Sequence, residues 1–153
     1  MKRLGFLLSL IAMPLFAQDI LPLRERATLI DQIQKDRIEN LLPQLMEEQD
    51  IDLWVLITRE YNEDPVVKTL LPPTWLNARR RTILVFSKTK YGIDPVAITR
   101  YNFGNNIRSI WNKEEQPDQW KALADYIVSQ NPKKIGVNIS EHYGIADGLV
   151  KTD

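Results

Sequence analysis

The chain of 153 residues contains no cysteine and a single histidine, His142. Without cysteine it can form neither a disulfide nor a Cys-based metal or redox site, and one histidine cannot build a histidine cluster. The sequence His-Glu-x-x-His is absent, and His142 stands at the start of an expected helix. We therefore interpret His142 as a surface residue, and the fold must be held together by its apolar core.

Other chemical devices are missing as well. There is no Gly-x-Ser-x-Gly elbow for a nucleophilic serine, and none of the six glycines forms a phosphate-binding loop after an expected strand. Twenty Lys and Arg residues balance twenty Asp and Glu residues, so the formal net charge is zero. This balance gives no support for binding to nucleic acid or to a membrane surface. The chain thus holds no complete catalytic constellation.

The N-terminus has the pattern of a signal peptide. Lys2 and Arg3 precede an apolar run, Leu4–Phe16, and Ala17 offers a small residue for cleavage. The run is too short to cross a bilayer comfortably, although a retained anchor is the alternative. We expect residues 1–17 to be removed, residues 18–153 to form one domain, and the product to be periplasmic or extracellular with no stable membrane span.

Helical and strand patterns alternate along the rest of the chain. Arg24–Glu48 has apolar residues at helical spacing, and Pro43 predicts a kink near Leu42 or two helices in sequence. Pro117-Asp118 begins a second helix to about Gln130, and Tyr143–Val150 is a third. Apolar runs predict strands at Ile51–Ile57, Thr82–Ser87, Pro95–Thr99, Ser109–Trp111 and Lys134–Ile139. The predicted fold class is α/β, a layered mixed sheet flanked by helices.

The helix that follows Pro117 should pack on the sheet through one apolar face. We assign to that face five residues at helical spacing: Trp120, Leu123, Ala124, Ile127 and Val128. Trp54, in the first strand, is expected in the core.

The connection Thr58–Arg81 between two expected strands is the most informative segment. Ordinary connections have about 4–6 residues, and long, chemically dense ones are usually functional or contact surfaces. We single out six of its residues as candidates on the substrate side or at an interface: Tyr61, Asp64, Trp75, Arg79, Arg80 and Arg81. Tyr61 and Trp75 could stack on a ligand or a partner, and the three arginines could bind carboxylates through paired hydrogen bonds.

The charges of this connection allow two interpretations each. Glu60, Glu63 and Asp64 could hold a hard cation, but a solvated acidic turn is the better interpretation. The cluster Arg79–Arg81 could bind a peptide terminus or a partner's acids. Alternatively it could pair with the three acids of the same loop, and we favour this local pairing.

The order of elements resembles the N-terminal domain of the creatinase, aminopeptidase P and prolidase family, the pita-bread metallopeptidases. The resemblance is carried by Ile51–Ile57, Thr82–Phe86 and Lys134–Asn138, and it covers roughly Leu21–Asp153. The segments Glu60–Lys68 and Ala78–Phe86 are similar to an exported, Xaa-Pro aminopeptidase-like branch.

The resemblance implies that catalysis lies elsewhere. Family members hold two divalent metal ions, manganese, cobalt or zinc, on Asp, His and Glu ligands of a C-terminal catalytic domain, and none of those ligands maps onto this chain. The resemblance further implies a homodimer or larger assembly and a peptide substrate for the complete protein. We therefore expect no catalytic residue, no metal ligand and no cofactor in these 153 residues.

Three functional hypotheses remain at this stage. The leading one is the non-catalytic N-terminal domain of an exported metallopeptidase, truncated before its catalytic domain, which shapes substrate access and subunit contacts. The alternative is a stand-alone secreted α/β module that binds a partner or a small anionic ligand through Arg79–Arg81. The least favoured is a small hydrolase that uses Glu60, Glu63 and Asp64, since it lacks a base–nucleophile pair.

Overall fold

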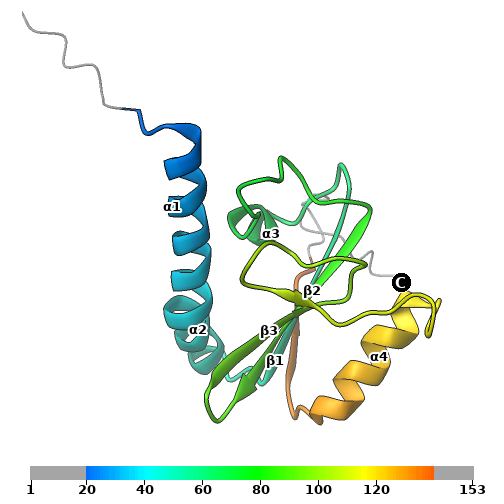
Figure 1. Cartoon of the computed structure of the whole chain (residues 1–153). Helices are drawn as coiled ribbons and strands as arrows, with labels where there is room; N and C mark the ends of the chain where they lie inside the picture. The colour runs from blue at the N-terminus through cyan, green and yellow to red at the C-terminus, as the bar shows by residue number, and fades with distance from the viewer. Residues whose placement is uncertain (1–19, 140–153) are drawn as a thin grey trace, which may run out of the picture.

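A computed structural model describes residues 20–139 and shows an α/β fold built around one five-stranded sheet (Figure 1). In chain order the elements are α1 Leu23–Asp36, η1 Arg37–Leu41, α2 Leu42–Glu48, β1 Leu53–Arg59, α3 Pro65–Thr69, β2 Arg81–Thr89, β3 Gly92–Ala97, β4 Arg108–Ser109, α4 Gln119–Gln130 and β5 Ile135–Val137. The predicted fold class is confirmed. The expected signal peptide and the expected helix Tyr143–Val150 lie outside the described residues.

The sheet has the strand order β4-β3-β2-β1-β5 and is mixed, as predicted. β1 and β2 are antiparallel, with Leu53 opposite Ser87 and Arg59 opposite Arg81. β2 and β3 form an antiparallel hairpin, whereas β4 lies parallel to β3 and β5 parallel to β1. The register places the end of β1 beside the start of β2, so the connection between them returns to one end of the sheet.

α1, η1 and α2 follow one another as a continuous helical stretch that changes its hydrogen-bond pattern before Pro43. The residues at these junctions keep right-handed helical dihedrals, and the N–H of Leu42 bonds to the carbonyl of Arg37, five residues earlier. Proline cannot donate the bond that an α-helix requires, and a π-turn is one way to accommodate the break. The predicted interruption near Leu42 is confirmed.

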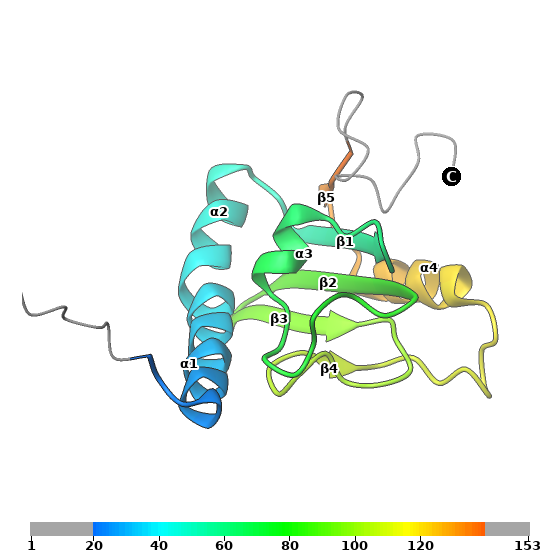
Figure 2. The same ribbon diagram turned by 90° about the horizontal axis from the view of Figure 1, so that it is seen from above.

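Helices cover both faces of the sheet (Figure 2), which explains the near-continuous apolar runs of its central strands. On the face of α1 and α2, Leu84 and Phe86 of β2 pack with Met46. On the other face, Ile83 and Val85 pack with Leu123 of α4. Alternate residues of β2 thus belong to opposite layers, as the period of a strand requires.

The buried face of α4 differs from the expected one. Ala124 and Val128 are exposed, and Val128 keeps 77% of its surface, because the buried face of α4 is rotated toward Ala122 and Tyr126. Trp54 is half-buried: it packs against the core cluster on the face of α1 and α2, and its indole N–H donates to Asn138 at 3.0 Å. The sequence interpretation also missed the helix α3 inside the long connection.

Within residues 20–139 no helix is both long enough and apolar enough to cross a bilayer.

Candidate functional site

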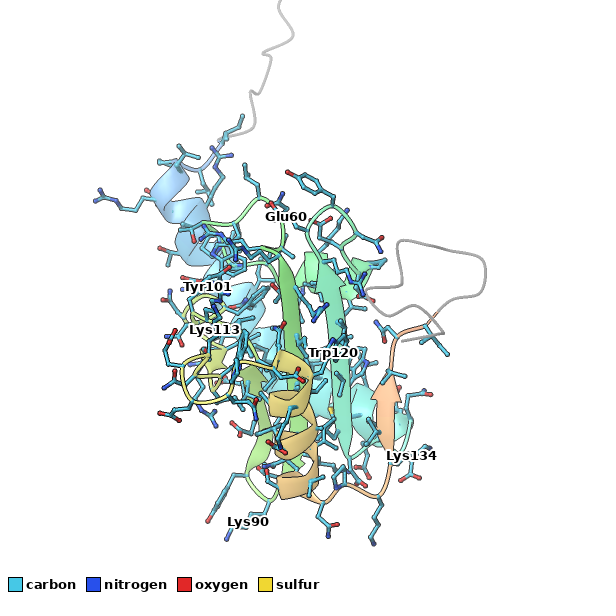
Figure 3. All side chains as sticks on the ribbon, turned by 90° about the vertical axis from the view of Figure 1, so that its right-hand side faces the viewer. Glu60, Lys90, Tyr101, Lys113, Trp120 and Lys134 are labelled. Carbon is cyan, nitrogen blue, oxygen red and sulfur yellow. The ribbon has the colours of Figure 1, made fainter. Side chains whose placement is uncertain are left out.

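A cavity of about 320 Å³ opens at the end of the sheet where β2 begins. We call it the arginine cavity. Its lining consists of Arg79, Arg80, Arg81, Thr99, Arg100, Tyr101, Trp111 and Gln119. The lining residues come from the end of the β1–β2 connection with the first residue of β2, from the segments that follow β3 and β4, and from the first residue of α4. Figure 3 shows Tyr101 and Trp120 on this side of the molecule, with Glu60 on the loop above them.

Two aromatic rings position Arg79. Its guanidinium carbon lies 4.9 Å from the ring centre of Trp75 and 5.7 Å from that of Tyr101. The two rings meet edge to face at 5.6 Å, and Trp75 also packs against the buried Phe103 at 4.9 Å. A guanidinium over an aromatic face is attracted by the ring's quadrupole. The rings therefore hold the cation in place without neutralising its charge.

Arg81 is held in a similar way on the opposite wall. Its guanidinium carbon lies 4.6 Å from the ring centre of Trp120. Its Nε is buried and has no hydrogen-bond partner among residues 20–139. The neighbouring Gln119 donates through its side-chain amide to the carbonyls of Arg81, at 3.2 Å, and Ile98, at 2.6 Å. Gln119 thus ties the start of α4 to β2 and to the end of the β3 segment.

Arg80 differs from its two neighbours. Its backbone has a φ of 51°, in the left-handed region that L-residues rarely adopt. Its N–H donates to a carboxylate oxygen of Glu60 at 3.2 Å, and the N–H of Glu60 donates to its carbonyl at 2.7 Å. Its side chain is exposed and makes no hydrogen bond, ion pair or ring contact within the described residues. The backbone is fixed while the guanidinium remains available.

The predicted pairing between Arg79–Arg81 and the acids of the same loop is wrong. Among residues 20–139, no ion pair joins these guanidinium groups to Glu60, Glu63 or Asp64. Glu60 binds the main chain of Arg80 instead. Arg79 and Arg81 contact aromatic faces instead, and the Arg80 side chain is exposed.

The predicted solvated acidic turn is wrong for two of its three acids, since only Glu60 is exposed. Asp64 is only 1% exposed and Glu63 only 7%. One carboxylate oxygen of Asp64 accepts the N–H groups of Val66 and Val67 at 2.7 and 3.3 Å, which caps α3. Its other oxygen accepts the side-chain amide of Asn138 at 2.9 Å. The pair Asp64-Pro65, a capping residue followed by proline at the first helical position, was the missed signal.

The remaining candidates lie at different distances from the arginine cavity. Trp75 stands behind Arg79 and outside the lining. Tyr61 is 87% exposed with a φ of 69°, and its N–H donates to Glu63 at 3.2 Å. The structure therefore brings the three arginines together and leaves Tyr61 and Asp64 elsewhere. Sequence reasoning missed Arg100, Tyr101 and Gln119, which lie after β3 and at the start of α4.

Within the described part of the chain, no three His, Cys, Asp or Glu residues are grouped so that they could hold a metal ion. Comparison with known proteins adds no identification. No protein-family model matches the chain, and neither a curated protein nor a solved structure matches it.

Proposed function

We propose that this domain is the non-catalytic N-terminal domain of an exported metallopeptidase of the pita-bread type, where it shapes substrate access and subunit contacts. The sequence resemblance motivates the proposal. The α/β architecture, with a mixed sheet covered by helices on both faces, is compatible with it. In this proposal the two divalent metal ions, manganese, cobalt or zinc, belong to a catalytic domain that follows residue 153.

The observation that carries the proposal is the amount of apolar surface left uncovered on the helical layer. Six large apolar side chains of α1, η1 and α2 keep between 38% and 77% of their surface: Leu23, Leu29, Ile30, Ile33, Leu41 and Leu45. Leu76, beside Trp75, is fully exposed. Extended exposed apolar surface marks contact sites with other proteins or domains. A domain that works against a second folded unit would have this surface.

A groove on the same side strengthens the argument. A cavity of about 560 Å³ lies between α1 and the segment after α3, and its walls include Ile30, Ile33, Leu71, Pro72 and Leu76. The walls are largely apolar, so the groove suits a packed protein segment better than a polar ligand. In the proposed parent protein this side would face the catalytic domain or a second subunit.

The test starts from the native product in the exported fraction of its own cells. Its intact mass should lie far above that of residues 18–153, and the recovered protein should hydrolyse Xaa-Pro peptides when manganese is supplied. The 153-residue chain alone should show no turnover under the same conditions. Metal-dependent hydrolysis by this chain alone, or a native mass equal to residues 18–153, would overturn the proposal.

A further inference from the structure

We propose that the arginine cavity is a binding site for a small ligand that carries two or more carboxylate groups. The proposal does not depend on the parent protein being a peptidase, because it concerns only contacts within residues 20–139. The proposed site includes Arg100, Tyr101 and Gln119 in addition to the three consecutive arginines of the sequence.

The charge of the cavity is one-sided. Four of its eight lining residues are arginines, and no carboxylate lines it. This is a local concentration of charge, because the whole chain has a formal net charge of zero. Four guanidinium groups around one small volume make it locally positive and attract anions, most strongly at low ionic strength. A ligand with two or three negative charges would be attracted more strongly than a ligand with one.

The walls are arranged to receive this anion. Arg79 and Arg81 rest on aromatic rings, which fix the positions of their guanidinium groups without neutralising their charge. The buried Nε of Arg81 has no acceptor among the described residues. Because this Nε is covered by the protein, a bound oxygen would approach the terminal N–H groups of Arg81, which lines the cavity. Arg80 and Arg100, exposed and uncommitted, can close on the ligand from the solvent side.

The donor set favours carboxylates over phosphate. Phosphate sites usually combine backbone amides of a glycine-rich loop or a free helix N-terminus. The cavity lining contains no glycine. The helix that reaches it, α4, has its first amides occupied, because Asp118 accepts the N–H groups of Trp120 and Lys121 at 2.9 and 3.3 Å. Arginine forks remain, and they bind carboxylates and phosphates alike through paired donors, so the preference for carboxylate rests on the lack of free backbone amides at the cavity.

The size of the cavity limits the ligand. About 320 Å³ is at the lower end of the range of roughly 300–1,000 Å³ for small-molecule sites. A short di- or tricarboxylate fits this volume. A folded partner would need a broader surface, so we assign a small molecule rather than a protein to this site.

The experiment is calorimetric titration of the full chain with succinate, citrate, acetate and inorganic phosphate at pH 7 and low ionic strength. Succinate and citrate should saturate and bind at least about tenfold more tightly than acetate or phosphate. Their affinity should fall as sodium chloride is added, because the interaction is between charges. Phosphate binding as tight as that of citrate, or no saturation by any carboxylate at about 10 mM, would overturn the proposal.

Variants locate the binding. Arg80→Gln removes a guanidinium that makes no hydrogen bond, ion pair or ring contact within the described residues, so the fold should persist. The affinity for citrate should drop about tenfold or more. Arg26→Gln, an exposed arginine of α1, is the matched control and should bind citrate as the parent does. Equal losses in the two variants would mean non-specific attraction and would overturn the site. Neither result bears on native mass or peptidase activity, so the two proposals can fail separately.

Discussion

The charged side chains in the two halves of the β1–β2 connection differ in burial and in hydrogen bonding. In the first half, Glu63 and Asp64 are buried, and their carboxylates accept N–H groups of their own loop. In the second half, Arg79 and Arg80 are exposed, and no acid of the described residues pairs with them. Sequence alone suggests that the two sets neutralise each other. The structure instead uses the acids to build the loop and leaves the arginines available at its end.

The difference follows from donor geometry. A carboxylate is an acceptor with two oxygens, and a short helix start such as that of α3 offers unpaired N–H groups close to it. A guanidinium is a donor only, and the carbonyls near Arg79–Arg81 are already engaged with Gln119, Thr82 and Glu60. Aromatic faces are then the remaining local partners. If this account is right, the acids should matter for stability and the arginines for binding.

The largest expected effect is that of Asp64→Ala. The change removes the cap of α3 and leaves the partly buried amide of Asn138 without its acceptor. We expect a loss of about 2–4 kcal/mol in the free energy of unfolding, measured by urea denaturation. Asp118→Ala is the matched control, since Asp118 caps α4 with the same two bonds but is exposed. That variant should lose about 1 kcal/mol.

Equal losses of unfolding free energy in these two variants would contradict the proposed structural role of the acids. They would show that burial and the Asn138 bond add nothing beyond a helix cap, and that the acidic half of the connection is no more structural than an ordinary helix start. A loss for Asp64→Ala that is at least about twice that for Asp118→Ala would support this role.

Next in size is Gln34→Leu, which tests how the connection is anchored. Gln34 is 1% exposed; its amide donates to the carbonyl of Leu70, and its oxygen accepts the amide of Asn106 at 2.8 Å. The change leaves a buried carbonyl unpaired, so we expect a loss of about 2 kcal/mol in the free energy of unfolding. Gln32→Leu, on the exposed side of the same helix, should stay within about 0.5 kcal/mol.

If Gln34 anchors the second half of the connection, its removal should also weaken citrate binding, because Arg79–Arg81 follow the loosened segment. An unfolding loss without any change in citrate affinity would mean that the arginine cavity is held by Trp75, Phe103 and Gln119 alone.

The sequence predicts the features that depend on local patterns and misses those that depend on contacts between distant segments. The sheet, the interruption before Pro43 and the start of α4 follow from local patterns, namely apolar runs, a proline and an Asp cap. The arginine cavity depends on Arg100 and Gln119, which lie far along the chain and meet Arg79–Arg81 only through the β1–β2–β3 pairing. Charge pairing failed as a guide because sequence proximity says nothing about burial. The rotation of α4 toward Tyr126 was missed because residues at helical spacing define more than one face.

A smaller effect is expected from Tyr126→Phe on the other layer. The Tyr126 hydroxyl lies 3.1 Å from that of Ser87, and burial raises the pKa of Tyr126 above its ordinary value of 10.0. The unfolded chain therefore releases this proton at a lower pH than the folded chain does, and the stability contributed by Tyr126 falls as the pH rises above about 10.

Tyr126→Phe should cost about 1 kcal/mol at pH 8, where the hydroxyl pair is lost. The gap between the parent and the variant should narrow as urea denaturation is repeated from pH 9.5 to pH 11. Tyr91→Phe is the control, since Tyr91 is 87% exposed at the β2–β3 turn. A gap that stays constant across this range would mean that the Tyr126 hydroxyl ionises equally easily in both states.

The smallest expected effect on stability is that of Arg80→Gln. This variant distinguishes most directly between a role in stability and a role in binding for the second half of the connection. The glutamine keeps the backbone bonds to Glu60 and the same left-handed φ, so the free energy of unfolding should change by less than about 0.5 kcal/mol. The same variant should lose citrate binding in the titration proposed above. Stability and binding would then be assigned to opposite halves of one connection. A loss of stability comparable to that of Asp64→Ala would show instead that the exposed guanidinium is part of the fold and that the arginines are structural after all.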